Sequence, residues 1–210
     1  GGRAGAVEDA GEEGRVEGAV VGLGQGVSRH WVVAALLGGA LLLALTPAVM
    51  RGWPAWQVLT WLQLPAYMLH QVEEHAGDRF RLFVNTHIGG GREALTHAAV
   101  AVINLPGVWG IDALALSMAV FLRPGFGLIA VYLALANAVV HVAAALVQRR
   151  YNPGLVTAVV VFLPLSAASL GAFAAVPGVG VADHALGVLV AVGVHVAIIV
   201  HVRRRLAALA

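Results

Sequence analysis

The feature that most constrains the fold is a set of six long apolar runs, which together fill most of the chain. A helix needs about 20 mostly apolar residues to cross the hydrocarbon of a bilayer, and each run has roughly that length. We therefore predict an all-α fold, a polytopic transmembrane helix bundle of about six spans. The predicted spans cover residues 31–50, 53–75, 94–122, 127–148, 154–175 and 182–201.

The overall composition also indicates a membrane protein and excludes several other classes. Hydrophobic residues make up 60% of the 210 residues and charged residues only 11%, whereas soluble domains average about 25% charged residues. The formal net charge is +2 and the basic residues are scattered, so we expect no nucleic-acid partner. The chain has no cysteine, which excludes disulfides, thiolate metal sites and cysteine nucleophiles.

The third span contains the sequence NLPGVWG, in which Pro106 and Gly107 interrupt an otherwise apolar run. Proline removes a backbone donor and clashes with the preceding turn, so it kinks helices. We predict one kinked helix here rather than two short re-entrant segments. The link before this span contains Gly89, Gly90 and Gly91, and it is predicted to be a flexible loop.

The first 29 residues differ from the rest of the chain because they are rich in glycine and in acidic residues. They have neither the cationic start nor the apolar middle of a signal peptide, so we do not expect cleavage by signal peptidase. Such a composition is typical of disorder. We therefore predict a disordered acidic tail over residues 1–29 and a transmembrane helical domain over residues 30–210.

The distribution of arginine predicts the orientation of the bundle. With six spans, one side of the membrane carries nine arginines: Arg29, Arg79, Arg81, Arg92, Arg149, Arg150, Arg203, Arg204 and Arg205. The other side carries only Arg51 and Arg123. Because positive residues accumulate on the cytoplasmic side, we predict that both termini are cytoplasmic and that the protein lies in a bacterial cytoplasmic membrane.

The sequence YMLHQVEEHAGDRF places His70, Glu73 and Glu74 in the last turns of the second span. At about 100° per residue these three side chains share one face of a helix. Ionisable groups inside a bilayer cost several kcal/mol unless they are paired or hydrated, and they usually mark a functional site. We therefore expect a site close to the cytoplasmic face.

Other spans place polar side chains at a similar depth, which favours one shared polar centre. Imidazole nitrogens together with carboxylate oxygens suit a transition metal such as iron, manganese or zinc. Glu73 and Glu74 are also the predicted catalytic residues. The predicted metal ligands are His70, Glu73, Glu74, His97, Asn137, His141 and His195.

The motif HQVEE resembles the motif that names the HXXEE-motif family of small integral membrane proteins, with His70, Glu73 and Glu74 at its defining positions. The resemblance extends through NAVVH, with Asn137 and His141, and through RRYNPGLVTA. It covers roughly residues 35–203. It implies a multi-span helical fold and a functional role for the three motif residues, but no particular reaction.

These observations lead to three hypotheses about function. The first is a membrane-embedded metalloenzyme with an iron centre, expected to be dinuclear, that hydroxylates or desaturates an apolar or amphipathic molecule. It would need an electron-transfer partner on the cytoplasmic side. The second is a zinc hydrolase, or a metal-free isomerase or cyclase that uses Glu73 or Glu74 as acid and base. The third is a small proton-coupled transporter or a scaffold.

Overall fold

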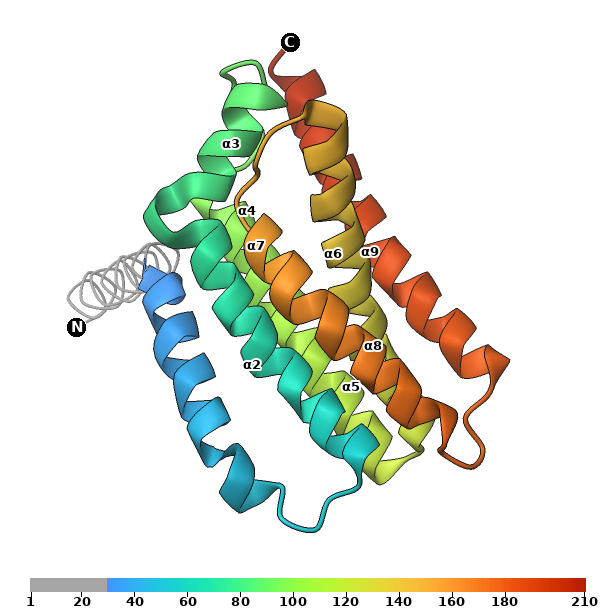
Figure 1. Cartoon of the computed structure of the whole chain (residues 1–210). Helices are drawn as coiled ribbons and strands as arrows, with labels where there is room; N and C mark the ends of the chain where they lie inside the picture. The colour runs from blue at the N-terminus through green and yellow to red at the C-terminus, as the bar shows by residue number, and fades with distance from the viewer. Residues whose placement is uncertain (1–29) are drawn as a thin grey trace, which may run out of the picture.

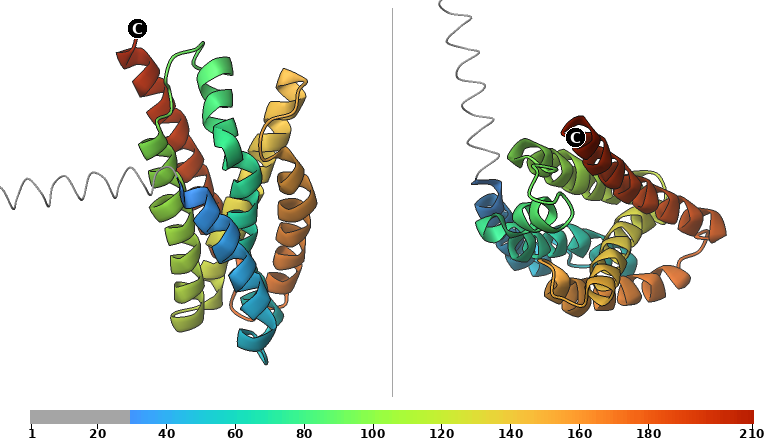
Figure 2. Two further views of the ribbon diagram at one scale, coloured as in Figure 1. Left: turned by 90° about the vertical axis from the view of Figure 1, so that its left-hand side faces the viewer. Right: turned by 90° about the horizontal axis from the view of Figure 1, so that it is seen from above.

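The computed structural model describes residues 30–210, and these residues form helices and no strand. Six long helices pack side by side as a bundle (Figures 1 and 2). The predicted tail, residues 1–29, lies outside the described residues. The elements are a first helix His30–Val49, α2 Ala55–His75, η1 Ala76–Asp78, α3 Arg79–His87, α4 His97–Val102, η2 Ile103–Trp109, α5 Gly110–Phe121, η3 Pro124–Gly127, α6 Leu128–Gln148, α7 Leu155–Thr157, η4 Ala158–Phe162, α8 Leu163–Ala174 and α9 Val181–Ala208.

The predicted all-α bundle is confirmed, and most of its long helices have the character of membrane spans. Among the described residues, five helices are long and apolar enough to cross a bilayer: His30–Val49, His97–Phe121, Pro124–Gln148, Leu155–Ala174 and Val181–Ala208. The remaining long helix, α2, is less apolar because it carries the polar residues of the site. The first helix, α3, α5, α6 and α8 all pack near α2 (Figure 1).

Helix α2 has a buried polar stripe with helical spacing. Its polar members include Thr60, Gln63, His70, Gln71 and Glu74, all buried. Gln63 donates to Ser169 of α8 at 3.0 Å, and Gln71 donates to Asn104 of η2 at 2.8 Å. Interhelical hydrogen bonds of this kind stabilise membrane bundles by about 0.6–2 kcal/mol each. They fix the rotation of α2 and thereby determine which neighbour each residue of the motif faces.

The third span is one continuous helix, as predicted, and its irregularity is a π-helical segment, Ile103–Trp109, around Pro106. Because proline has no backbone N–H, the chain widens for one turn instead of ending the helix. The fifth span has a similar segment, Ala158–Phe162, directly before its own proline, Pro164.

The link between the second and third spans is more ordered than the sequence predicted, because it contains η1 and α3. Helix α3 is short and partly polar, so no apolar run marked it. Asn85 closes the glycine-rich loop after it, since its side chain donates to the Leu95 carbonyl at 2.9 Å and accepts from the Leu95 N–H at 2.8 Å. Within this loop, Gly90 and Gly91 have the positive φ that glycine allows.

Candidate metal centre

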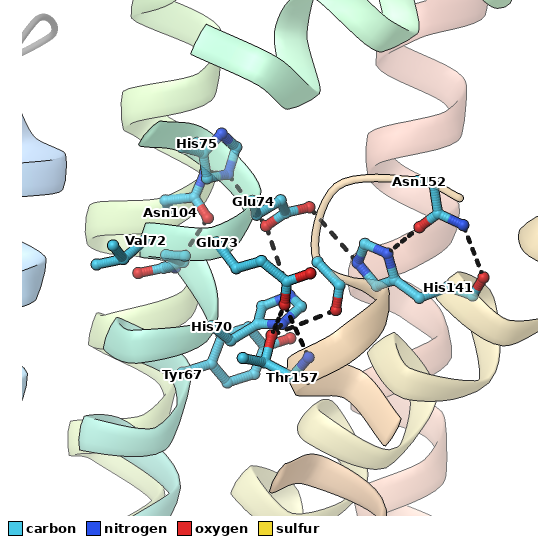
Figure 3. Close-up of polar contacts among 12 residues, drawn as sticks. Tyr67, His70, Val72, Glu73, Glu74, His75, Asn104, His141, Asn152 and Thr157 are labelled. Carbon is cyan, nitrogen blue, oxygen red and sulfur yellow. Dashed lines mark hydrogen bonds and ion pairs between the residues drawn. The ribbon is translucent and has the colours of Figure 1, made fainter. Parts of the chain in front are cut away.

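Three buried side chains from two helices form the centre of the site, namely His70 and Glu74 of α2 and His141 of α6. Each offers one ligand atom, and these atoms all lie within 4.8 Å of one another. The His70 Nε2 atom is 3.6 Å from one Glu74 oxygen, and the His141 Nε2 atom is 3.5 Å from the other. Figure 3 shows Glu74 between the two imidazoles.

The hydrogen bonds of His70 determine its tautomer. Its Nδ1 atom is 2.8 Å from the Thr157 hydroxyl, and that hydroxyl also contacts the Glu73 carboxylate. A carboxylate can only accept, so the single hydroxyl hydrogen of Thr157 goes to Glu73. The hydroxyl oxygen must then accept from His70, which places a proton on Nδ1; when the ring is neutral, the lone pair is therefore on Nε2.

Independent contacts lead to the same tautomer at His141. The Asn152 amide nitrogen donates to the His141 backbone carbonyl at 2.9 Å, so its amide oxygen is the atom turned to the His141 Nδ1 atom. Because that oxygen can only accept, Nδ1 carries the proton. In their neutral forms, both imidazoles therefore direct an Nε2 lone pair toward Glu74.

Two imidazole nitrogens and a carboxylate that face one another could hold a cation between them. The His70 Nε2 atom is buried and has no hydrogen-bond partner among the described residues. Two ligand atoms of one tetrahedral ion are ~3.4 Å apart. His70 and His141 lie at comparable distances, 3.6 and 3.5 Å, from the two different oxygens of Glu74. The donor set, the orphaned Nε2 atom and the spacing fit a transition metal.

Gly154 shapes the space between the imidazoles. Its φ of +100° lies in the region that glycine favours. A Cβ atom at this position would lie 2.7 Å from the His141 Cε1 atom and 2.8 Å from the His70 Cε1 atom. The glycine of the YNPG sequence thus lets the backbone pass beside both rings without filling the space between them.

Glu73 has a different environment from its neighbour Glu74. It accepts from the Thr157 backbone N–H at 2.7 Å, the Val156 N–H at 3.1 Å and the Tyr151 hydroxyl at 2.8 Å, as well as from the Thr157 hydroxyl. These backbone groups begin the fifth span, where a helix has unpaired N–H groups that favour an anion. Glu73 therefore caps that helix and, through Thr157, orients His70.

His75 also touches the cluster, although it was absent from the predicted ligands. Its Nε2 atom is 3.1 Å from a Glu74 oxygen and 3.3 Å from the Asn104 amide nitrogen. Asn104 in turn accepts from Gln71, which accepts from Trp109 at 2.6 Å. The signal for His75 was its place directly after the motif, beside Glu74, but its position on the helix face was less favourable than that of the motif residues.

The other predicted ligands lie outside the three-residue cluster. His97 is about half exposed, and its Nε2 atom is 3.8 Å from Asp78. The Nδ1 atom of His195 is 2.8 Å from the Ala191 carbonyl of its own helix. His195 and Asn137 instead line the neighbouring cavity.

A cavity of about 380 Å³ lies next to the cluster, bounded by α2, α3, α4, η2, α6 and α9. Glu74, His75 and His141 form part of its wall, whereas His70 and Glu73 do not. Most of the wall is apolar, with Phe80, Val100 and Ile198 among its residues. A molecule in this cavity would therefore reach one side of the cluster from an apolar environment.

The fold and the site define a class: a polytopic helical membrane protein with a buried cluster of two histidines and one glutamate. A family model described as "Protein of unknown function with HXXEE motif" matches residues 61–169, just over half of the chain, and the chain belongs to this HXXEE family. The match includes both imidazoles, both glutamates and the YNPG segment. No curated protein and no solved structure matches the chain.

Proposed function

We propose that this protein is a membrane-embedded metalloenzyme that acts on an apolar or amphipathic small molecule. His70, Glu74 and His141 would hold one divalent transition metal, and the cavity beside them would bind the substrate. The observation that carries the proposal is the pair of Nε2 atoms that face the two Glu74 oxygens, on rings that are each held at Nδ1 by a partner of their own. Such outer contacts are typical of metal-bound histidines.

A proton on one imidazole is the main alternative to a metal ion between these atoms. A proton would satisfy one acceptor pair, whereas His70, His141 and Glu74 bring three ligand atoms to one point. The adjacent His75 already gives Glu74 a nearby imidazole at 3.1 Å. A divalent ion, bound by all three ligands at once, accounts for the whole arrangement.

We propose a single ion rather than the dinuclear centre expected from the sequence. A dinuclear centre in a helix bundle uses several carboxylates, some of which bridge the two ions. Here Glu74 is the one carboxylate in the cluster of described residues. Glu73 could not bridge without giving up the backbone and hydroxyl donors that it binds.

Iron is the metal we favour, and the chemistry we propose is oxidation of the substrate by dioxygen, with further electrons from an electron-transfer partner. Two histidines and one carboxylate are the donor set of mononuclear iron oxygenases, in which the remaining positions stay open for reactants. The apolar cavity suits a substrate whose reacting group is a hydrocarbon. The same donor set also binds catalytic zinc, so a zinc hydrolase is the second candidate. In such a hydrolase Glu73 would be a poor general base, because its oxygens already accept hydrogen bonds from four donors.

We also propose that the end of the bundle that carries α3 and the C-terminus faces the cytoplasm of a bacterium. The support is the arginine asymmetry of the sequence, because Arg79, Arg81 and Arg92 lie in the link at this end. The site would then lie near the cytoplasmic face, where an electron-transfer partner could reach it.

Metal analysis of the purified protein tests the proposal. We expect one iron per chain after expression in iron-sufficient medium, and loss of that iron in His70→Ala, His141→Ala and Glu74→Ala. The matched control is His97→Ala, which removes a histidine outside the cluster and should keep the metal. Stoichiometric zinc would select the hydrolase. Full metal content in the three variants, or none in the wild type, would overturn the metal site.

A further inference from the structure

The cavity beside the cluster is long and narrow, and the polar side chains at one of its ends differ from those along its length. We propose that it binds one single-chain fatty acid, whose carboxylate contacts Gln148 and Arg203 and whose hydrocarbon chain runs past the cluster toward Leu133. The inference rests on the proposed function, because the acid is taken to be the substrate of the metal centre. It adds the chemical class of that substrate and the part of it that faces the cluster.

The length of the cavity follows from the helix faces that line it. On α6 the lining residues run from Leu133 to Gln148, and on α9 they run from Val194 to Leu206. At about 1.5 Å per residue these two faces are ~22 and ~18 Å long. The volume of about 380 Å³ is near the lower end of the roughly 300–1,000 Å³ of small-molecule sites. Spread over such a length it leaves a narrow space, which suits one unbranched chain better than a ring system or a lipid with two chains.

Most of the wall along this length is apolar, and its polar side chains are largely engaged within the protein. Those with hydrogen bonds to described residues are Tyr67, Asn104, Asn152 and, at its Nδ1 atom, His195. The side-chain oxygen of Asn137 is buried away from the cavity surface. A hydrocarbon chain in the cavity would therefore leave few polar groups without a partner, and the cost of burying them is small.

Gln148 and Arg203 differ from these residues, because neither has a side-chain hydrogen bond or an ion pair among the described residues, although both line the cavity. Arg205, in contrast, pairs with Glu93. Gln148 ends α6 and Arg203 lies in the last two turns of α9, so both lie at the end of the bundle that carries the C-terminus (Figure 1). An amide and a guanidinium are hydrogen-bond donors that suit a carboxylate.

The charge of this end favours a carboxylate over a phosphate monoester. Arg203 is the one arginine among the lining residues, and the chain has no lysine. A single positive charge matches the single negative charge of a carboxylate, whereas a phosphate monoester carries about −1.5 to −2 at neutral pH. Because Arg203 is exposed, the carboxylate would stay in contact with water and would not need to be desolvated.

The position of the cluster between the two ends determines which part of the acid it faces. Along α6, His141 is ~12 Å from Leu133 and ~10 Å from Gln148, and it forms part of the wall with Glu74 and His75. An acid held at Gln148 and Arg203 would therefore present inner carbons of its chain to the cluster, rather than its carboxylate or its methyl end.

The first test compares three probes with the same sixteen-carbon chain: palmitate, 1-hexadecanol and hexadecyl phosphate. Each is added at matched mole fraction to the protein in lipid nanodiscs, and its apparent affinity is obtained from the rise in Tm. We expect palmitate to bind most tightly. Arg203→Gln should weaken palmitate about three- to fivefold, the upper range for an exposed ion pair, and leave hexadecanol unchanged. The matched control is Arg204→Gln, because Arg204 carries the same charge but does not line the cavity.

The second test examines the far end of the cavity. Val194→Phe should shorten the space and weaken palmitate about tenfold, the loss expected when about two methylene groups are no longer buried, while decanoate keeps its affinity. Val192→Phe is the control, because Val192 is exposed on the same helix and does not line the cavity. Palmitate with a diazirine at carbon 15 should photolabel the region of Leu133 and Val194.

Each part of the inference can fail separately. Tighter binding of hexadecanol or hexadecyl phosphate overturns the carboxylate, and so does an equal loss of palmitate affinity in Arg203→Gln and Arg204→Gln. An equal loss of decanoate and palmitate in Val194→Phe overturns the extended placement, as does labelling near Gln148 by the diazirine at carbon 15.

These measurements do not depend on the metal, so they separate this inference from the proposed function. Wild-type protein without metal that still prefers palmitate, with the preference lost in Arg203→Gln, overturns the metal site and supports the fatty-acid site. Protein with one metal per chain and no preference for palmitate supports the metal site and overturns the fatty-acid site.

Discussion

Glu73 and Glu74 are adjacent in the last turns of α2, but their carboxylates have different surroundings. On one side Glu73 faces the start of the fifth span and binds donors only, two of them backbone N–H groups. On the other side Glu74 faces imidazoles and the cavity. The first environment is that of a helix cap, and the second is the one that the proposed function requires of a metal ligand. Adjacent identical residues thus have different tasks because about 100° of helix rotation separates them.

The largest effect on metal affinity should follow from removing the charge of Glu74, the carboxylate on the cavity side of α2. Glu74→Gln removes a ligand, and since even outer-sphere partners of a metal contribute about 10–100-fold to affinity, we expect a loss of more than about 100-fold. Metal affinity is measured by competition with a chelator in detergent. Glu73→Gln is the comparison, and a larger loss in that variant would reverse the assignment of the two glutamates.

The next largest effect should come from Gly154, whose backbone passes beside the imidazole rings of His70 and His141. Gly154→Ala combines a clash with both imidazoles with backbone strain of about 1–3 kcal/mol, so it should lower stability and abolish stoichiometric metal binding. Gly178→Ala is the matched control, because Gly178 also has a positive φ of +82° but open space around it. That control should lose stability and keep the metal. Normal metal content in Gly154→Ala would show that the rings do not need this spacing.

A smaller effect is expected on the capping side. Thr157→Val keeps the shape of the side chain but removes the hydroxyl that links Glu73 to His70. The metal affinity should fall about 10–100-fold, with one ion still bound at saturation, because an outer-sphere contact is lost and the ligand remains. Thr157→Ser keeps the hydroxyl and should bind metal as the wild type does. An unchanged affinity in Thr157→Val would mean that the tautomer of His70 is fixed in another way.

The smallest effect should come from Tyr151, which is about half exposed. Partial burial and the nearby Glu73 carboxylate raise the pKa of Tyr151 above its usual value, so its hydroxyl stays protonated and donates to Glu73 across the neutral range. Tyr151→Phe removes one solvent-accessible hydrogen bond of about 0.5–1.5 kcal/mol, and we expect a loss of metal affinity below about threefold. A tenfold loss of metal affinity would indicate that Tyr151 helps to orient His70 through Glu73.

The sequence alone was sufficient for the helical bundle and for the continuity of the third span. Hydrophobic runs report span length, and the helical repeat places His70 and Glu74 near one another. The repeat does not report which neighbouring helix lies against each side of α2. Glu73 was therefore grouped with the ligands, although it faces the fifth span. His195 and Asn137 have the depth of the cluster, but the rotation of their helices turns them toward the cavity.

The contacts of Glu73 have a consequence for the assembly of the protein. One carboxylate both caps the start of the fifth span and, through the Thr157 hydroxyl, contacts the His70 imidazole of another helix. Before the fifth span docks, this hydroxyl is not beside His70 and does not hold its ring. Under the proposed function, docking of the fifth span would therefore have to precede capture of the ion, and a half-assembled bundle would not hold a loosely bound, reactive ion.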